Sequence, residues 1–269
     1  MRSHSPAGTS LPSASLEFGR FVRMRRFGIV LIVAGVALPL TGCKADRASQ
    51  QPSTIDSRVS DLPKADSPDP SPTPATPLEP AKDPQDKRPL IVCFGDSLTA
   101  GFGTEAGQTY PDYLQADLEA LGYKYRVVNA GISGNTTKDG ADRVDHIAAM
   151  KPAVVVVEFG GNDGLRGLRI DDSRTNLDKI VETLKRNGAK VVLAGITLPP
   201  DYGPDYIKQF NETYVLIAKK HQVPVLPFLL KGVFGVDGMM QRDRTHATAK
   251  GNKAVADNVL PLVAPLLKK

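Results

Sequence analysis

The sequence has no tryptophan, only two cysteines and only four histidines among its 269 residues. Such a chain cannot form a disulfide-rich scaffold, and it lacks the cysteine and histidine clusters that a zinc site needs. Cys93 stands in an apolar run, where cysteine behaves as a small hydrophobic side chain, whereas Cys43 follows an N-terminal apolar segment. We therefore expect no disulfide and no metal site.

The sequence also has little excess of basic over acidic residues outside the N-terminal segment. The net charge is +5, but residues 1–42 hold five arginines against one acidic residue, Glu17. A positive face for nucleic acid would need lysines and arginines clustered within the folded part of the chain. We expect no nucleic-acid partner.

Residues 23–43 have the plan of a secretory signal. Arg25 and Arg26 precede a short apolar run, which contains Pro39 and is followed by small residues. The run is too short for a confident membrane span, which takes about 20 residues. Met24 is a plausible true start, because residues 1–23 add nothing to this pattern.

The end of that segment, Leu-Thr-Gly-Cys at residues 40–43, resembles the lipobox of bacterial lipoproteins. The resemblance implies cleavage before Cys43 and lipidation of its thiol, so that a lipid would hold the protein on a membrane outside the cytoplasm. The alternative is a secreted protein in which Cys43 is incidental.

Residues 43–87 are rich in proline, serine and aspartate and poor in apolar residues. Such a segment cannot bury enough apolar surface to offset the entropy lost on ordering, and its prolines favour an extended chain. We predict three parts: a leader at 1–42, a disordered tether at 43–87 and a folded domain at 88–269.

From residue 88 onward, short apolar runs alternate with amphipathic stretches. Runs such as LIVCF and AVVVVEF are nearly continuous, as expected for strands that are covered on both faces. The pattern predicts a parallel sheet with helices on both sides. The predicted strands are 90–94, 125–129, 153–159, 190–195 and 224–226, and the predicted helices are 110–121, 138–150, 173–187, 205–220 and 247–267.

Polar and glycine-rich segments follow the predicted strands. Ser97 comes after the first strand, Gly134 lies in the turn after the second, and Asn162 follows the third. In parallel sheets the reactive groups gather at the carboxyl ends of the strands. We therefore expect these residues to meet at one edge of the sheet.

A serine nucleophile needs a base, usually a histidine that a carboxylate orients. His4 lies in the leader, while His146 and His221 lie in predicted helices. Only His246 follows a carboxylate, Asp243, by three residues in a predicted loop. Alone this pattern is weak, because Asp243 and Thr248 could simply cap the last helix.

The tetrahedral intermediate of acyl transfer also needs hydrogen-bond donors for its oxyanion. The backbone N–H groups of Ser97 and Gly134 and the side-chain amide of Asn162 could supply them. Taken singly, Gly134 is more simply a turn residue and Asn162 the end of a strand. Their common place at strand ends favours the catalytic interpretation.

Two rival motifs are absent. Gly101 and Gly103 match the first two glycines of the dinucleotide-binding motif Gly-x-Gly-x-x-Gly, but residue 106, the third position, is alanine. No acidic residue clearly stands at the end of a following strand, as that motif requires. The Gly-x-Ser-x-Gly elbow of α/β-hydrolases is missing around Ser97.

The segments GDSLTAGFG, NAGISGNTT, VEFGGNDGLRG and the final Asp-x-x-His resemble the SGNH hydrolases, also called the GDSL family, and within it the bacterial multifunctional esterases. The resemblance covers essentially all of residues 88–269. It implies a flavodoxin-like three-layer α/β/α sandwich with a five-stranded parallel sheet. It also implies catalytic Ser97, Asp243 and His246, an oxyanion hole of Ser97, Gly134 and Asn162, and no cofactor.

The same resemblance places segments 164–169 and 198–204 at the border of an acyl pocket, with Leu165, Leu168 and Leu198 as candidate lining residues. The sequence differs from the family at Asn135, where an Asp is often seen, and in carrying a lipobox and tether, which leaves the substrate open. We expect a monomeric serine esterase that acts on acyl esters, thioesters or lysophospholipids. A carbohydrate O-acetylesterase and an inactive lipid-anchored binding protein are the alternatives.

Overall fold

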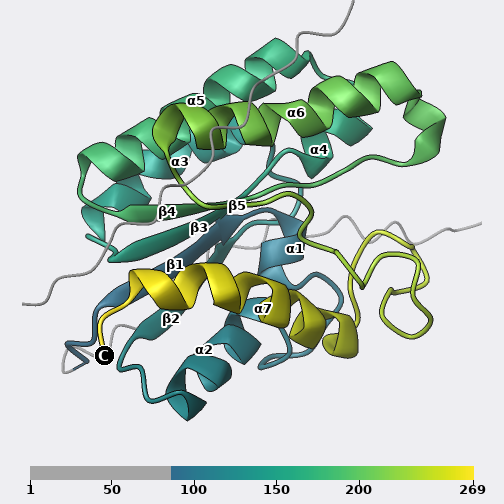
Figure 1. Cartoon of the computed structure of the whole chain (residues 1–269). Helices are drawn as coiled ribbons and strands as arrows, with labels where there is room; N and C mark the ends of the chain where they lie inside the picture. The colour runs from purple at the N-terminus through teal and green to yellow at the C-terminus, as the bar shows by residue number, and fades with distance from the viewer. Residues whose placement is uncertain (1–85) are drawn as a thin grey trace, which may run out of the picture. The chain divides into compact units, whose positions relative to one another are not determined.

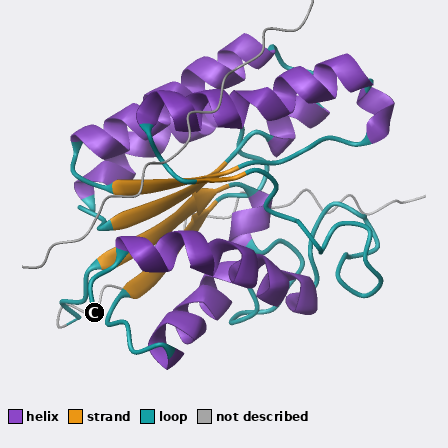
Figure 2. Cartoon of the chain, in the orientation of Figure 1, coloured by secondary structure: helices purple, strands orange, loops and turns teal. Residues whose placement is uncertain are grey.

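A five-stranded parallel sheet forms the centre of the domain. The computed structural model describes residues 86–269, so the predicted leader, Cys43 and the predicted tether up to residue 85 lie outside the described residues. The strand order is β2-β1-β3-β4-β5, and every neighbouring pair is parallel (Figure 2). The strands are β1 (Leu90–Gly95), β2 (Arg126–Gly131), β3 (Val154–Glu158), β4 (Lys190–Ala194) and β5 (Val225–Leu226).

Helices cover both faces of this sheet (Figure 1). They are α1 (Ser97–Ala100), α2 (Tyr110–Ala120), α3 (Thr137–Ala149), α4 (Gly161–Leu165), α5 (Ile170–Arg186), α6 (Pro204–His221) and α7 (Ala249–Val263), with short 3-10 turns at Pro200–Tyr202 and Ala264–Leu266. Helices α3, α5 and α6 pack on one face, and α2 and α7 pack on the other. The predicted three-layer sandwich is therefore confirmed.

The central strands are apolar throughout because both of their faces are covered. Val92 and Phe94 of β1 point into one layer of the core, and Ile91 and Cys93 point into the other, all without exposed surface. Burying each aliphatic side chain of this size contributes about 1.5–3 kcal/mol. This buried, apolar centre fixes where β1 and β3 end.

Two of the helices begin at capping boxes that the sequence encodes. Thr109 and Asp112 cap α2, and Thr136 and Asp139 cap α3, each pair by reciprocal hydrogen bonds. Each cap satisfies backbone N–H groups that have no partner within the helix. Helix α3 therefore starts at a defined residue after β2, close to the carboxyl edge of the sheet.

The strand order produces a switch point at the carboxyl end of β1. The chain leaves β1 for β2 on one side and then crosses to β3 on the other side. Loops that leave β1 and β3 therefore diverge to opposite faces of the sheet and open a crevice between them. Within residues 86–269, none of the helices has the length and apolar character needed to cross a membrane.

Candidate active site

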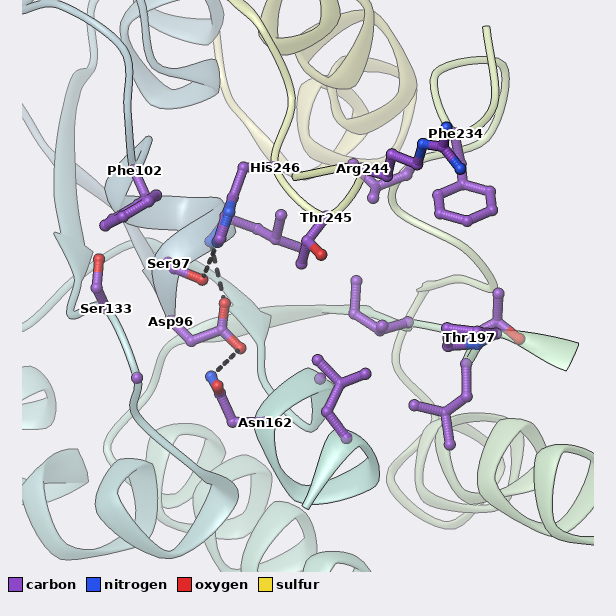
Figure 3. A pocket seen from close by; sticks show the side chains of 18 of the residues that line it. Asp96, Ser97, Phe102, Ser133, Asn162, Thr197, Phe234, Arg244, Thr245 and His246 are labelled. Carbon is purple, nitrogen blue, oxygen red and sulfur yellow. Dashed lines mark hydrogen bonds between the residues drawn. The ribbon is translucent and has the colours of Figure 1, made fainter. Parts of the chain in front are cut away.

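Ser97, His246 and Asp243 form a continuous chain of hydrogen bonds. Ser97 opens α1 directly after β1, and His246 stands in the loop before α7. Nε2 of His246 lies 2.9 Å from Ser97 Oγ (Figure 3). Its Nδ1 lies 2.7 Å from Asp243 Oδ2. The structure therefore brings together the three residues that the sequence selected as a triad.

A tight turn holds Asp243, the acidic residue of these three. Oδ1 of Asp243 accepts the backbone N–H groups of Thr245 and His246 at 2.9 and 3.0 Å. Burial alone would raise the pKa of Asp243, but these bonds and the contact with the His246 ring hold it below the ordinary value. Thr248 alone caps α7, so Asp243 does not act as a cap of that helix.

The other histidines of the domain lie elsewhere. His146 is exposed on α3. His221 ends α6 and contacts Asp178 Oδ1 through its Nε2 at 2.7 Å. The second Asp–His pair escaped the sequence analysis because its members come from two different helices. It does not line the pocket at Ser97.

The three candidate oxyanion donors, one of which is Ser97 itself, border one pocket. Gly134 lines the pocket and has a φ of +82°, a conformation that suits glycine. The side chain of Asn162 donates from Nδ2 to the backbone oxygen of Asn135 at 2.9 Å and to Asp96 Oδ2 at 3.2 Å. Ser97, Gly134 and Asn162 therefore line the same pocket, as predicted from their places at strand ends.

Arg143 connects several segments at the carboxyl edge of the sheet. The sequence analysis did not select it. Its Nη1 and Nη2 donate to the backbone oxygens of Ala130 and Gly95, both at 2.9 Å, and its Nε donates to Asn135 Oδ1 at the same distance. The guanidinium also lies over the ring of Phe94. Burial lowers the pKa of Arg143 to about 10. Arg143 thus joins Asn135, and with it the turn that contains Gly134, to the ends of β1 and β2.

The pocket around Ser97 has a volume of about 300 Å³ and a mostly apolar lining. Leu165 and Leu198 lie in the lining, as expected. Leu168 lies outside it, because the chain turns at Gly167 and the N–H of Leu168 folds back to the backbone oxygen of Asp163. The remaining apolar lining residues are Leu98, Phe102, Ile196, Pro199, Phe228, Leu230 and Phe234.

The aromatic members of this lining come from segments with no sequence periodicity. The ring of Phe102 lies 4.7 Å from the His246 ring, and Phe228 packs edge-on against Phe234. Figure 3 shows Phe102 and Phe234 on opposite sides of the Ser97–His246 pair. Within the described part of the chain, no group of three or more histidine, cysteine, aspartate or glutamate side chains is arranged to hold a metal ion.

The sequence also matches known proteins over most of the described domain. A model of the GDSL-like lipase/acylhydrolase family matches residues 93–254. The chain is 43% identical to the esterase TesA of Pseudomonas aeruginosa over 178 residues, which cover 66% of this chain and 89% of that protein. It is 34% identical over 178 residues to the thioesterase 1/protease 1/lysophospholipase L1 of Escherichia coli K12, covering 66% and 84%.

Solved structures give the same result. The crystal structure of TesA matches with a TM-score of 0.64 at 43% identity, covering 66% of this chain and 99% of that one. That of AlinE4, an SGNH-hydrolase family esterase, matches with a TM-score of 0.57 at 36% identity, covering 68% and 98%. The matched residues therefore span the sheet, its helices and the pocket.

Proposed function

Because the chain belongs to the GDSL-like lipase/acylhydrolase family, we propose that it is a serine esterase that cleaves carboxylic ester or thioester bonds of acyl substrates through an acyl-enzyme. One observation supports this most directly: the hydrogen bonds that run from Ser97 through His246 to Asp243 at an apolar pocket. This is the geometry that activates a serine hydroxyl for attack on a carbonyl.

In the first step, Ser97 Oγ attacks the carbonyl carbon of the substrate while His246 Nε2 takes the hydroxyl proton. Asp243 accepts the Nδ1–H bond of the ring, which keeps Nε2 unprotonated and stabilises the imidazolium that forms. The proton then passes to the leaving alcohol or thiol, and an acyl-Ser97 ester remains. Water enters, His246 takes its proton, and hydrolysis releases the acid and restores Ser97.

Negative charge develops on the carbonyl oxygen in both steps. The Ser97 and Gly134 N–H groups and the Asn162 amide are the donors assigned to it in this mechanism. Removing one such donor in other enzymes lowers kcat by about 100-fold to 1,000-fold. Asn162 already donates to Asp96 and Asn135, so one of these bonds has to be exchanged for the bond to the oxyanion.

The lining of the pocket favours an acyl chain longer than acetyl. Leucine, isoleucine and phenylalanine side chains surround a volume of about 300 Å³. Each methylene removed from water contributes about 0.8 kcal/mol, or roughly fourfold in kcat/KM. An O-acetylesterase would gain nothing from such a lining. The name of the E. coli relative, which includes thioesterase and lysophospholipase, is consistent with a substrate that carries an acyl chain.

The test is hydrolysis of p-nitrophenyl acyl esters of increasing chain length. We expect kcat/KM to rise from acetate to medium-chain esters, and Ser97→Ala to abolish hydrolysis. A wild-type protein that cleaves only acetate would favour the O-acetylesterase alternative. Failure of a fluorophosphonate probe to label Ser97 in folded protein would instead favour the inactive binding protein.

We further propose that Cys43 carries the lipid that holds this domain on a membrane, outside the cytoplasm, with residues 44–87 as a tether. The support is the pattern of residues 23–43: arginines, an apolar run and small residues before the cysteine. In a bacterial host, Cys43→Ser should move the protein from the membrane to the soluble fraction and stop incorporation of labelled palmitate. Retention of palmitate by that variant would refute the anchor.

A further inference from the structure

Two buried acidic residues lie at the pocket, one in its lining and one behind it. Asp96 follows β1, and Glu158 ends β3, the neighbouring strand. Asp96 is 2% exposed and Glu158 is fully buried. The backbone N–H of Asp96 and the hydroxyl of Thr99 donate to Glu158 Oε2 at 3.3 and 2.8 Å. The mechanism above uses neither carboxyl group.

Two negative charges in such a position would repel each other without screening by water, so the pair holds one proton over a wide pH range. The backbone N–H of Asp96 donates to Glu158 Oε2, so the two side chains start from the same buried site. Oε1 of Glu158 is buried and accepts no hydrogen bond from any donor in the described residues. A proton on a neighbouring carboxyl group would be a donor for such an oxygen.

The surroundings of the two groups distinguish them further. Asp96 lines the pocket in which the oxyanion forms, whereas Glu158 does not. Figure 3 shows the Asp96 carboxyl group between Ser97 and Asn162. A charge on Asp96 would therefore repel the oxyanion more strongly than a charge on Glu158 would.

The amide of Asn162 connects this pair to catalysis. Its two hydrogens point to the backbone oxygen of Asn135 and to Asp96 Oδ2. An ionised Asp96 would hold the amide by a charge-assisted bond, roughly twice as strong as a neutral one. A neutral Asp96 holds it weakly, so the amide can turn to the oxyanion as negative charge develops there.

We propose that Asp96 is the neutral acid of this pair, that the single negative charge resides on Glu158, and that this arrangement positions the Asn162 amide for release to the oxyanion. The inference rests on the proposed function, because it assigns a role within that reaction. Asp96 and Glu158 are positioning residues here, since they act through Asn162.

The charged and titratable groups around the pair are consistent with this assignment. Burial and then the charge of Glu158 raise the pKa of Asp96 well above its ordinary value, against the N–H of Leu98 and the nearby His246. Burial also raises the pKa of Glu158, while the bonds from Thr99 and Asp96 lower it. The hydroxyl of Tyr110 contacts Thr99, which adds no charge.

The experiment compares Asp96→Asn with Glu158→Gln in the full chain. Both changes replace one carboxyl by an amide of the same shape. The amide introduced by Asp96→Asn stays neutral and can still donate to Glu158. The amide introduced by Glu158→Gln instead donates to Asp96 and stabilises its ionised form. We expect Glu158→Gln to lower kcat for p-nitrophenyl esters by about tenfold or more with little change in KM, and Asp96→Asn to lower it less.

The double variant Asp96→Asn/Glu158→Gln separates charge from packing. It removes the ionisable group beside Asn162, so its kcat should exceed that of Glu158→Gln even though it carries one more change. A purely structural role predicts the opposite order. The inference is refuted if Asp96→Asn is the more damaging single change, or if the double variant is no faster than Glu158→Gln.

A spectroscopic measurement keeps the test independent of whether the variants fold. In wild-type protein labelled with ¹³Cγ-aspartate, the Asp96 resonance at neutral pH should have the chemical shift of a protonated carboxyl group. Fluorophosphonate labelling of Ser97 reports separately on the proposed function. A carboxylate shift for Asp96 in protein that labels normally would overturn the inference and leave the esterase assignment intact.

Discussion

Nε2 of His246 lies 2.9 Å from Ser97 Oγ, although 149 positions separate the two residues in the sequence. The contact forms because the end of β1 and the loop before α7 meet at the carboxyl edge of the sheet. Its geometry depends on the ring orientation of His246, which Asp243 sets through Nδ1. The contact between Asp243 and His246 is 2.7 Å long, and Asp178 and His221 form a second Asp–His contact of 2.7 Å.

Asp243→Asn should therefore lower kcat by about 100-fold to 10,000-fold with a small effect on KM, because the amide favours the wrong tautomer of His246. Steady-state kinetics on p-nitrophenyl esters measure this. Asp178→Asn is the matched control, since it alters an Asp–His contact of equal length away from the pocket. Equal loss of kcat in the two variants would contradict the role assigned to Asp243.

Asp178 should instead affect stability at low pH. Bonds from Lys220 and His221 outweigh the effect of burial and lower the pKa of Asp178 in the folded protein. The folded state then binds fewer protons than the unfolded state near pH 4, the ordinary range of aspartate. The stabilisation is present above that range and disappears as the pH falls through the lowered value.

Thermal unfolding at neutral pH and at about pH 3 measures this contribution. The two conditions lie above and below the ordinary pKa of aspartate, about 4. The wild type should lose more Tm on acidification than Asp178→Asn does, because the variant lacks the titrating group. Identical pH dependence of Tm in the two proteins would exclude a contribution from Asp178.

Much of the fold follows from local pattern. The apolar runs of β1 and β3 are continuous because helices cover both faces, and they indicated a parallel sheet before any contact was known. The strand-end rule then selected Ser97, Gly134 and Asn162. Helix and strand ends differ from expectation by a few residues; α5, for example, starts at Ile170 rather than 173. The four-residue and five-residue helices α1 and α4 are too short to show periodicity.

Contacts between elements could not be predicted in the same way. Asp96 and Glu158 meet because β1 and β3 pair with Gly95 opposite Glu158, a register that no local pattern encodes. The aromatic lining from Phe228 and Phe234 comes from an irregular segment after β5. Leu168 was expected in the pocket on the basis of its segment, but the turn at Gly167 excludes it.

Gly134→Ala tests the oxyanion turn. An alanine at a φ of +82° is strained by roughly 1–2 kcal/mol, although only Arg166 Nη2, at 3.9 Å, lies near the added carbon. Gly122 has a φ of +81° and open space around it, and it precedes β2 whereas Gly134 follows that strand. Gly122→Ala is therefore a control for strain alone.

Both alanine variants should lose a similar amount of unfolding free energy in urea. Only Gly134→Ala should also lose kcat, because its N–H moves relative to the oxyanion. If Gly122→Ala lowers kcat as much, the loss is due to general destabilisation and Gly134 has no special role.

The last prediction concerns the pocket and uses two leucines that are close in sequence and nearly equal in exposure. Leu165 is 43% exposed and lines the pocket, whereas Leu168 is 41% exposed and does not. Leu165→Asp should lower kcat/KM for medium-chain esters more than for acetate, because a charge in the lining opposes burial of methylenes worth about 0.8 kcal/mol each. Leu168→Asp should leave the chain-length profile unchanged. The profile is measured with one series of p-nitrophenyl esters, and equal shifts in both variants would mean that the acyl chain does not pass Leu165.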